Sequence, residues 1–257
     1  MKMTFYKYQG TGNDFIIVDN RTKTFPKNNV DIITKLCDRH FGIGADGVIL
    51  LENNTATDFR MIYFNADGSE TMCGNGGRCA VAFAKQLNII DSKTTFTAFD
   101  GKHYAEINNG LVSLHMIDVN EVIIKDTYTF ANTGTQHHVE MVDNLDNFPV
   151  FEKGKDIRYN IYGETGSNVN FVEQLTTDTF RVRTYEKGVE DETLACGTGV
   201  TAVAIAMHAT KKTTETSINL PVEGGLLKVH FEENNGSYSN IFLEGPAVCV
   251  FKGEIEL

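Results

Sequence analysis

Two stretches of this chain repeat one arrangement, a cysteine followed by a glycine-rich turn and then an apolar run of alanine and valine. The first reads CGNGGRCAVAFA from Cys73, and the second reads CGTGVTAVAIA from Cys196. Each run predicts a helix that is apolar on all sides, and such a helix must be enclosed by protein. The repeat therefore predicts two similar domains, each built around one buried central helix that starts at a cysteine.

Short strand-like segments fill most of the remaining chain. They carry β-branched or aromatic residues, often in alternation with polar ones, and are bounded by Gly, Asn or Asp. Strands are predicted at 14–19, 47–52, 59–64, 94–99, 103–107, 111–116, 122–125, 138–142, 168–174, 179–185, 226–231 and 241–245. One further helix, an amphipathic one, is predicted over 29–40. The expected fold class is α/β, with two pseudo-symmetric domains, each a curved and mostly antiparallel sheet around a buried central helix.

The join between the two predicted domains carries no Pro- or Gly-rich linker. We place it between Ile117 and Glu121, so that the first domain covers 1–117 and the second covers 118–248. A length of 257 residues with 41% hydrophobic content is enough for one large or two modest cores.

Charge and cysteine content exclude several classes of protein. The formal charge is 23 − 34 = −11, without a lysine or arginine cluster, so neither nucleic acid nor a membrane surface is an expected partner. The first ten residues lack the apolar core of a signal peptide, and no apolar run approaches the roughly 20 residues that span a bilayer. Five cysteines without C-x-x-C spacing are typical of free thiols in a reducing compartment. We therefore expect a cytoplasmic protein.

A cysteine at the N-terminus of a helix has a chemical consequence. The first backbone N–H groups of a helix lack partners within it, and the aligned peptide dipoles leave partial positive charge there. This charge stabilises a thiolate, and the same amides bind a carboxylate or phosphate. Each of the two motifs therefore predicts an anion-binding turn beside a reactive sulfur.

Simpler interpretations apply to several features. Cys37, Cys79 and Cys249 are interpreted as small buried hydrophobic residues. The glycine turns match neither the G-x-x-x-x-G-K-[ST] nor the strand-linked G-x-G-x-x-G phosphate-binding pattern. The cysteines and histidines lack the spacing of a zinc site, and we identify no Schiff-base lysine or phosphate cup for pyridoxal phosphate. No metal and no cofactor are therefore expected.

Two opposed thiols suggest a specific reaction. If the two domains face each other, both helix N-termini point into one cleft and hold a substrate carboxylate with its α-carbon between the sulfurs. A thiolate on one face can then remove the α-proton while a thiol on the other face returns one, which inverts the stereocentre. The helix ends stabilise the enediolate charge that develops.

The motifs together resemble those of the diaminopimelate epimerase family, cofactor-independent amino-acid epimerases of lysine and peptidoglycan biosynthesis. The resemblance runs from end to end in the same order. It rests on GTGNDFIIVD (10–19), CDRHFGIGADG (37–47), FNADGSETMCGNGGRC (64–79), NVNFV (168–172) and ETLACGTGVTAVA (192–204).

The resemblance implies roles for the residues that match. Cys73 and Cys196 would be the acid/base pair, each serving one stereochemical direction. Backbone amides would hold the reacting α-carboxylate, and asparagines would bind mostly the distal amino-acid end of the substrate. The residues concerned are Gly74, Asn75, Gly197 and Thr198 for the amides, and Asn13, Asn65 and Asn168 for the asparagines.

Two further residues gain a role only through the resemblance. His137 would lie near the first cysteine and tune its protonation, and Glu186 would pair with the second cysteine and with a substrate ammonium. Lys187 stands where the family usually has an arginine that grips a carboxylate, and lysine cannot reproduce its bidentate fork. Thr135 and Gln136 stand where asparagine or serine followed by proline is commoner. The segment 189–192 is one residue longer than the commonest spacing, which a loop can absorb.

The function expected from these features is the interconversion of LL- and meso-2,6-diaminopimelate by two-thiol proton transfer. The resemblance also implies that residues 249–257 complete the first domain and that the protein forms a homodimer. Two alternatives stay open. The first is an epimerase, or a binding protein, for another amino acid, which Lys187 keeps open. The second is a thiol redox protein in which Cys73 and Cys196 form a reversible disulfide.

Overall fold

The chain folds into two compact units in a computed structural model that describes residues 2–257. Unit 1 comprises Met1–Leu114 and Gly245–Leu257, and unit 2 comprises His115–Glu244. The sequence placed the corresponding boundaries at 117/118 and 248/249. No helix within residues 2–257 is both long enough and apolar enough to cross a membrane.

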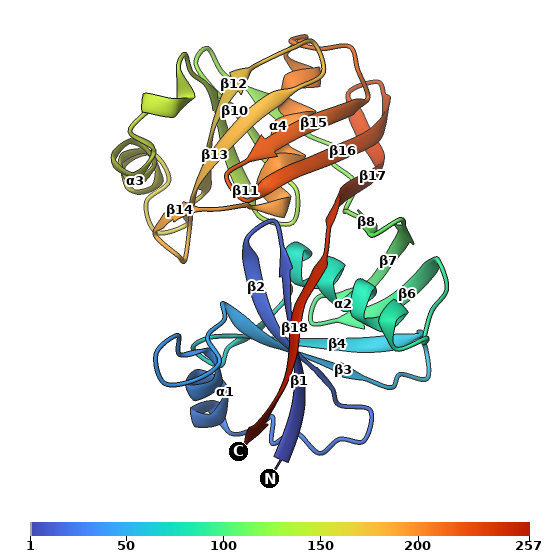
Figure 1. Ribbon diagram of the computed structural model, residues 1–257. Helices are drawn as coiled ribbons and strands as arrows, with labels where there is room; N and C mark the ends of the chain where they lie inside the picture. Colours follow the sequence, from blue (N-terminus) through green and yellow to red (C-terminus); the bar gives the residue numbers. More distant parts are fainter. Residues whose placement is uncertain (1) are drawn as a thin grey trace. The chain divides into compact units, whose positions relative to one another are not determined.

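Unit 1 is built on one mixed sheet, seen in the lower part of Figure 1. Its strand order is β18-β1-β2-β3-β4-β6-β7-β8, with β5 paired to β4. Neighbouring strands are antiparallel except for the pairs β2–β3 and β4–β6. The strands are β1 Lys2–Gly10, β2 Asn13–Asp19, β3 Gly47–Glu52, β4 Phe59–Asn65, β5 Glu70–Thr71, β6 Lys93–Ala98, β7 Gly101–Asn108, β8 Leu111–His115 and β18 Val248–Glu256.

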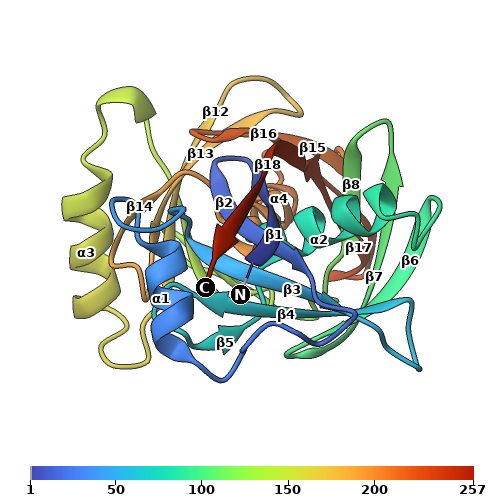
Figure 2. The ribbon, with the colours of Figure 1, turned by 60° about the horizontal axis from the view of Figure 1, so that its bottom comes forward.

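Two helices cover opposite faces of the central strands β2, β3 and β4. Helix α1, Val30–Cys37, packs beside β3 with Ile33 and Leu36 buried (Figure 2). Helix α2, Gly74–Gln86, packs on the other face of the same strands, against the residues whose side chains point away from α1. The core with α1 includes Ile16, Val48 and Ile62, whereas Gly76 of α2 faces Phe15, Ile49 and Met61. Because side chains alternate between the faces of a strand, both faces are covered, and every residue of β3 is buried.

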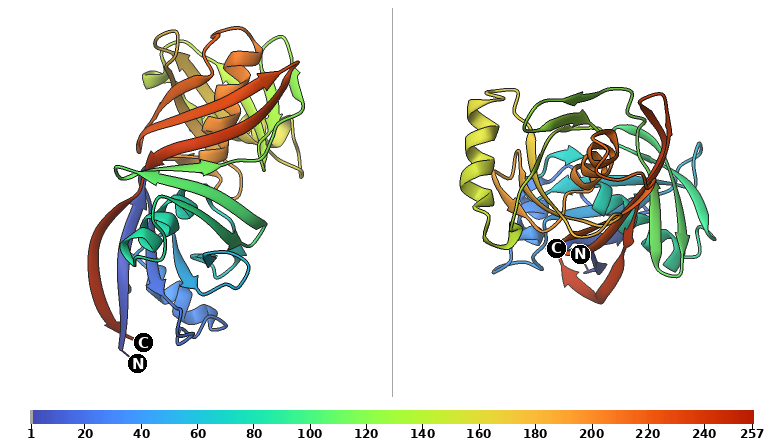
Figure 3. Two further views of the ribbon diagram at one scale, coloured as in Figure 1. Left: turned by 90° about the vertical axis from the view of Figure 1, so that its right-hand side faces the viewer. Right: turned by 90° about the horizontal axis from the view of Figure 1, so that it is seen from above.

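Unit 2 encloses its central helix with strands from two ladders. Helix α4, Gly197–Ala209, contacts β10 to β13 and also β15 and β16, and the right-hand view of Figure 3 shows the strands around it. The first ladder has the order β14-β13-β12-β11-β10-β9, with only β11 and β12 parallel, and the second is the meander β15-β16-β17. The strands are β9 Val122–Ile124, β10 Thr129–Asn132, β11 Gln136–Met141, β12 Asn168–Gln174, β13 Phe180–Glu186, β14 Asp191–Thr193, β15 Ser217–Val222, β16 Gly225–Asn234 and β17 Ser237–Pro246.

The structure contains elements that the sequence analysis missed. Helix α3, Val150–Asn160, packs on β12 and β13, and a short 3₁₀ helix, Leu145–Asn147, precedes it. Strands β1, β5, β10, β14 and β15 were not among the predicted segments, and β18 was expected only from the family resemblance. Strand β15 contains Pro221, which argues against a central strand, and β15 lies at the end of its ladder, where a proline is tolerated.

The C-terminal strand returns to unit 1. Strand β18 pairs with β1 over nearly its whole length, from Lys2 opposite Glu256 to Gln9 opposite Val248. The prediction that Cys249 is a buried hydrophobic residue was wrong, because this thiol is exposed on β18. Cys37 and Cys79 are buried, as expected.

Candidate active site

Both repeated cysteines occupy the residue before a helix begins. Cys73 is the N-cap of α2 and Cys196 is the N-cap of α4, and both have extended backbone angles, φ −132° and −118°. Neither thiol caps the helix, and neither helix has an acidic residue in its first turn. No acidic residue within the first turn of either helix therefore neutralises the positive end of its dipole. The prediction that each motif starts a buried helix is confirmed.

The first cysteine site consists of Asn13, Asp46, Cys73, Asn75 and Arg78 in unit 1. The Cys73 thiol donates to Asn13 Oδ1 at 3.4 Å. Asn75 Nδ2 donates to the same oxygen at 3.3 Å. The other end of Asn13, its Nδ2, donates to a carboxylate oxygen of Asp46. The hairpin between β1 and β2 thus brings Asn13 against the start of α2.

Arg78 is the fully buried member of this site, and its role was not predicted from the sequence. Its guanidinium is fully buried and donates to Asn75 Oδ1 and to Thr11 Oγ1, each at 3.0 Å. Its Nε has no hydrogen-bond partner within residues 2–257, and burial lowers the pKa of the side chain. The signal that could have identified it is an arginine inside an otherwise apolar helix start, because such a charge is rarely buried without a purpose.

A charged cluster supports Asn13 from its other side. Asp14 pairs with Lys7 and with Arg39, each at 2.7 Å, and Arg39 also pairs with Asp46 at 2.8 Å. Burial of Asp14 would raise its pKa, but the hydrogen bonds from Arg39 and Lys7 outweigh this and hold the pKa below its usual value. These ion pairs keep the carboxylate of Asp46 beside Asn13.

Asn65 lies at the end of β4 in unit 1. Its Nδ2 donates to Ser69 Oγ at 3.0 Å and to Thr71 Oγ1 at 3.3 Å. These bonds tie it to the turn that leads through β5 into Cys73.

The second cysteine site consists of Thr135, His137, Cys196 and Thr198 in unit 2. Cys196 Sγ is 3.5 Å from Thr198 Oγ1. Thr198 Oγ1 is 3.2 Å from Thr135 Oγ1, which is 2.9 Å from His137 Nε2. A continuous row of hydrogen-bonding atoms therefore connects the thiol to the imidazole.

His137 is fully buried on β11. Its Nδ1 is 3.2 Å from Asn170 Nδ2 on the neighbouring strand β12. Burial lowers the pKa of His137 to about 3, so the imidazole is neutral near pH 7. These hydrogen bonds connect His137 to the site of the second cysteine, and its place near the first cysteine, which the resemblance implied, stays a prediction. The role of Asn170 was not predicted from the sequence. It could have been suspected because Asn170 lies two residues after Asn168 on one strand, so both side chains point to the same face.

Asn168, Glu186 and Lys187 lie beside the second cysteine site. Asn168 Nδ2 donates to Thr135 Oγ1 at 3.3 Å, and its Oδ1 accepts from the backbone N–H of Lys187 at 2.8 Å. The Lys187 ammonium donates to the carbonyl of Thr165. Glu186 Oε2 accepts from Thr193 Oγ1 at 3.0 Å.

The segment 189–192, which the resemblance implied to be one residue longer than usual, is held by Glu190. Its carboxylate lies 3.2 Å from Arg158 Nη2 and accepts from the Tyr185 hydroxyl at 3.1 Å. Glu190 has a positive φ of 58° in the turn before β14. The segment therefore forms a turn with its own ion pair.

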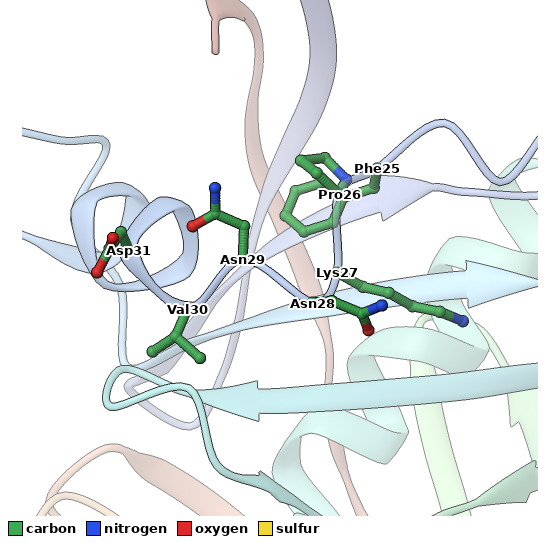
Figure 4. A pocket seen from close by; sticks show the side chains of 7 residues that line it. All are labelled: Phe25, Pro26, Lys27, Asn28, Asn29, Val30 and Asp31. Carbon is green, nitrogen blue, oxygen red and sulfur yellow. The ribbon is translucent and has the colours of Figure 1, made fainter.

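Features elsewhere in the chain are distinct from these two sites. Burial raises the pKa of Cys37 to about 11 and that of Cys79 to about 12, which makes both thiols unreactive near pH 7. A surface hollow lies at the start of α1, lined by residues 25–31 (Figure 4), and contains none of the predicted site residues. Within residues 2–257, no three His, Cys, Asp or Glu side chains are grouped so that they could hold a metal ion.

Solved structures of other proteins share the fold of this chain. The solved structure of a Bacillus anthracis protein of the PhzF phenazine biosynthesis family superimposes with a TM-score of 0.79 at 14% identity, covering 100% of both chains. A hydroxyproline epimerase from Agrobacterium vitis gives a TM-score of 0.70 at 15% identity, covering 100% of this chain and 93% of the other. At these identities the likeness concerns the fold.

Relatives in sequence are much closer. A diaminopimelate epimerase of Flavobacterium psychrophilum is 60% identical, covering 98% of this chain and 100% of its own length. One from Chlorobaculum tepidum is 42% identical, with coverages of 96% and 99%. The family model described as Diaminopimelate epimerase matches residues 5–116 and 129–250. This chain therefore belongs to the diaminopimelate epimerase family.

Proposed function

We propose that this protein is an isomerase that interconverts LL- and meso-2,6-diaminopimelate, with Cys73 and Cys196 as the acid/base pair. The observation that carries this proposal is the pair of cysteines placed as N-caps of two central helices, in a chain 60% identical to a diaminopimelate epimerase over its whole length. Inversion at a carbon requires a base on one face and an acid on the other, and two thiols supply both without a cofactor.

The helix ends would bind the reacting carboxylate. Backbone amides at Gly74 and Asn75, and at Gly197 and Thr198, belong to first turns without acidic residues. Such amides hydrogen-bond a carboxylate in the ground state and bind more strongly as it becomes an enediolate. This differential stabilisation is the main electrostatic contribution that the proposal requires of the protein.

The asparagines would orient the remainder of the substrate. We assign Asn13, Asn65 and Asn168 to its distal amino-acid end, and Glu186 to an ammonium group. Asn13 and Asn168 are each held in one orientation by their neighbours, which supports a role in positioning. His137 would influence the acid/base chemistry as a neutral imidazole.

The substrate of the reaction can be tested directly. Purified protein incubated with LL-diaminopimelate should produce the meso isomer, and the same protein should leave proline and other monocarboxylic amino acids unchanged. Activity on a monocarboxylic amino acid alone would overturn the proposal. Cys73→Ala and Cys196→Ala variants serve as matched controls, since each lacks one of the two proton-transferring groups.

A different amino acid as substrate is the second candidate, and one observation favours it. Lys187 replaces the arginine usual in the family, and its ammonium is engaged by the Thr165 carbonyl. Lysine cannot form the bidentate fork of arginine with a carboxylate. A Lys187→Arg variant with an unchanged KM for diaminopimelate would show that this position does not limit carboxylate binding.

The cellular setting is also part of the proposal. All five cysteines are free, which suits the reducing conditions of the cytoplasm. The net charge of −11 disfavours nucleic acid as a partner. We further propose a homodimer, which sedimentation velocity would distinguish from a monomer of 28.5 kDa.

A further inference from the structure

The carboxamides around the second cysteine site are fixed in orientation. Asn168 Oδ1 accepts from the backbone N–H of Lys187, so its Nδ2 is the atom that faces Thr135. Asn170 Oδ1 accepts from Thr184 Oγ1 at 2.9 Å, and its Nδ2 donates to the His138 carbonyl at 2.9 Å. A backbone N–H can only donate and a carbonyl can only accept. Neither amide can turn over without losing these bonds.

These orientations determine which nitrogen of His137 carries the proton. Its Nδ1 faces a donor, the Asn170 Nδ2 group, at 3.2 Å. A neutral imidazole has one N–H and one acceptor nitrogen, so Nδ1 is the acceptor and the proton is on Nε2. His137 Nε2–H therefore donates to Thr135 Oγ1 at 2.9 Å.

The direction of the hydrogen bonds then follows to the sulfur. Thr135 Oγ1 already accepts from His137 and from Asn168, so its own hydrogen is directed to Thr198 Oγ1 at 3.2 Å. Thr198 Oγ1 accepts this hydrogen and keeps its own to donate, and we infer that it donates to Cys196 Sγ, which lies 3.5 Å away. The sulfur of Cys196 ends this relay as a hydrogen-bond acceptor.

The first cysteine site has the opposite polarity. A carboxylate can only accept a hydrogen bond, so the Nδ2 group of Asn13 must face Asp46. The Oδ1 atom of Asn13 therefore faces Cys73. Asn75 Nδ2 donates to the same oxygen because Arg78 holds the other end of that amide. An amide oxygen cannot donate, so Cys73 makes this contact only when its sulfur carries a proton.

We propose, building on the function proposed above, that a hydroxyl relay of Thr135 and Thr198 holds Cys196 as the resting thiolate while Asn13 holds Cys73 as the resting thiol. In the resting protein, Cys196 S⁻ is the base and takes the α-proton, and the C–H electron pair passes into the enediolate. Cys73 S–H is the acid and gives its proton to the carbon. After one turnover Cys196 is the thiol and Cys73 the thiolate, and exchange with solvent restores the resting pair. Thr135 acts through Thr198 and is a positioning residue.

Charged groups near each site act alongside these hydrogen bonds. Around the second site they are Glu186 and Lys187, together with the neutral His137 and the positive end of α4, which favours a thiolate. Around the first site, Arg78 and the positive end of α2 favour a thiolate at Cys73, whereas the negative charges of Asp14 and Asp46 oppose it. Arg78 donates to Asn75 and Thr11, and the direct contact of the Cys73 thiol with Asn13 favours its protonated form.

The pH dependence of alkylation of each thiol tests the proposal without any substrate. Iodoacetamide labelling followed by peptide mass spectrometry gives a midpoint for Cys73 and for Cys196 in wild type, Thr135→Val and Thr135→Ser. We expect the wild-type midpoint of Cys196 to lie below that of Cys73. Thr135→Val, which keeps the shape but removes the hydroxyl, should raise the Cys196 midpoint by about one pH unit, a roughly tenfold loss of thiolate. Thr135→Ser should restore it, and the Cys73 midpoint should not change.

Two results would overturn the assignment. One is a Cys73 midpoint at or below that of Cys196 in the wild type, a comparison that needs no variant and holds even if Thr135→Val does not fold. The other is an unchanged Cys196 midpoint in folded Thr135→Val. Failure to turn over diaminopimelate would refute the proposed function instead, because the labelling experiment contains no amino-acid substrate.

Discussion

Burial of His137 makes the stability of this protein depend on pH in a way that one substitution isolates. The imidazole is 0% exposed, and burial lowers its pKa from its usual 6.5 to about 3. Between these two values the unfolded chain binds a proton that the native state does not bind. The contribution of His137 to stability is therefore fully present above about pH 6.5, and it is lost progressively as the pH falls toward 3.

The expected size follows from the two pKa values. Each pH unit inside this window costs about 1.4 kcal/mol, so a change from pH 7 to pH 5 should remove about 2 kcal/mol of unfolding free energy. Carboxylates also titrate as the pH falls, so the wild type must be compared with His137→Gln, whose side chain does not titrate. Urea unfolding of both proteins at pH 7, 6 and 5 measures the difference.

We expect the wild type to lose about 2 kcal/mol more than His137→Gln between pH 7 and pH 5. Equal losses in the two proteins would refute the neutral, buried imidazole. Such a result would also remove the basis for the direction of the hydroxyl relay, which depends on His137 Nδ1 as an acceptor. A protonated imidazole has no acceptor nitrogen.

Three further substitutions test other parts of the two sites. Arg78→Lys keeps the positive charge, but lysine lacks the fork with which Arg78 bridges Asn75 and Thr11. Steady-state epimerisation should show kcat reduced at least about tenfold, and an unchanged kcat would contradict a positioning role for Arg78. Gly199→Ala places a Cβ 2.5 Å from Asn170 Oδ1 and 3.3 Å from Cys196 Sγ, and urea unfolding should show a loss of about 1–3 kcal/mol, whereas a stability equal to the wild type would mean that Asn170 moves without cost. Asp46→Asn removes the carboxylate that orients Asn13, so the alkylation midpoint of Cys73 should fall, and a rise would argue against the assigned orientation of Asn13.

The parts of the fold that were predictable are those that local pattern determines. The two central helices were predicted from apolar runs after a glycine turn, and β3 was predicted from a continuous apolar segment. Protein encloses these elements on nearly all sides, so their sequences are mainly apolar. Helix α3 was missed because Gly154 interrupts its pattern. A Cβ at Gly154 would lie 2.3 Å from Tyr185 Cβ, so packing against β13 requires this residue, and no local signal contains that requirement.

The candidate site shows the same division. The cysteines could be identified from their motifs, and the asparagines from the family resemblance. Arg78 and Thr135 gain their roles only through contacts between distant segments, with Thr11 lying 67 residues from Arg78 and Thr198 lying 63 residues from Thr135. Thr135 was noted only as a departure from the family pattern. In the structure, the hydroxyl of Thr135 contacts that of Thr198, which in turn contacts the sulfur of Cys196.

The central claim is that the thiols of Cys73 and Cys196 act on one α-carbon, one as base and the other as acid. Conversion of LL-diaminopimelate in D₂O, sampled at low turnover, tests this claim most directly. The account predicts that the meso product carries one solvent deuterium at the inverted carbon, while recovered LL substrate remains protiated. Product that retains the original hydrogen, or equal labelling of product and recovered substrate, would indicate a single base and contradict the account.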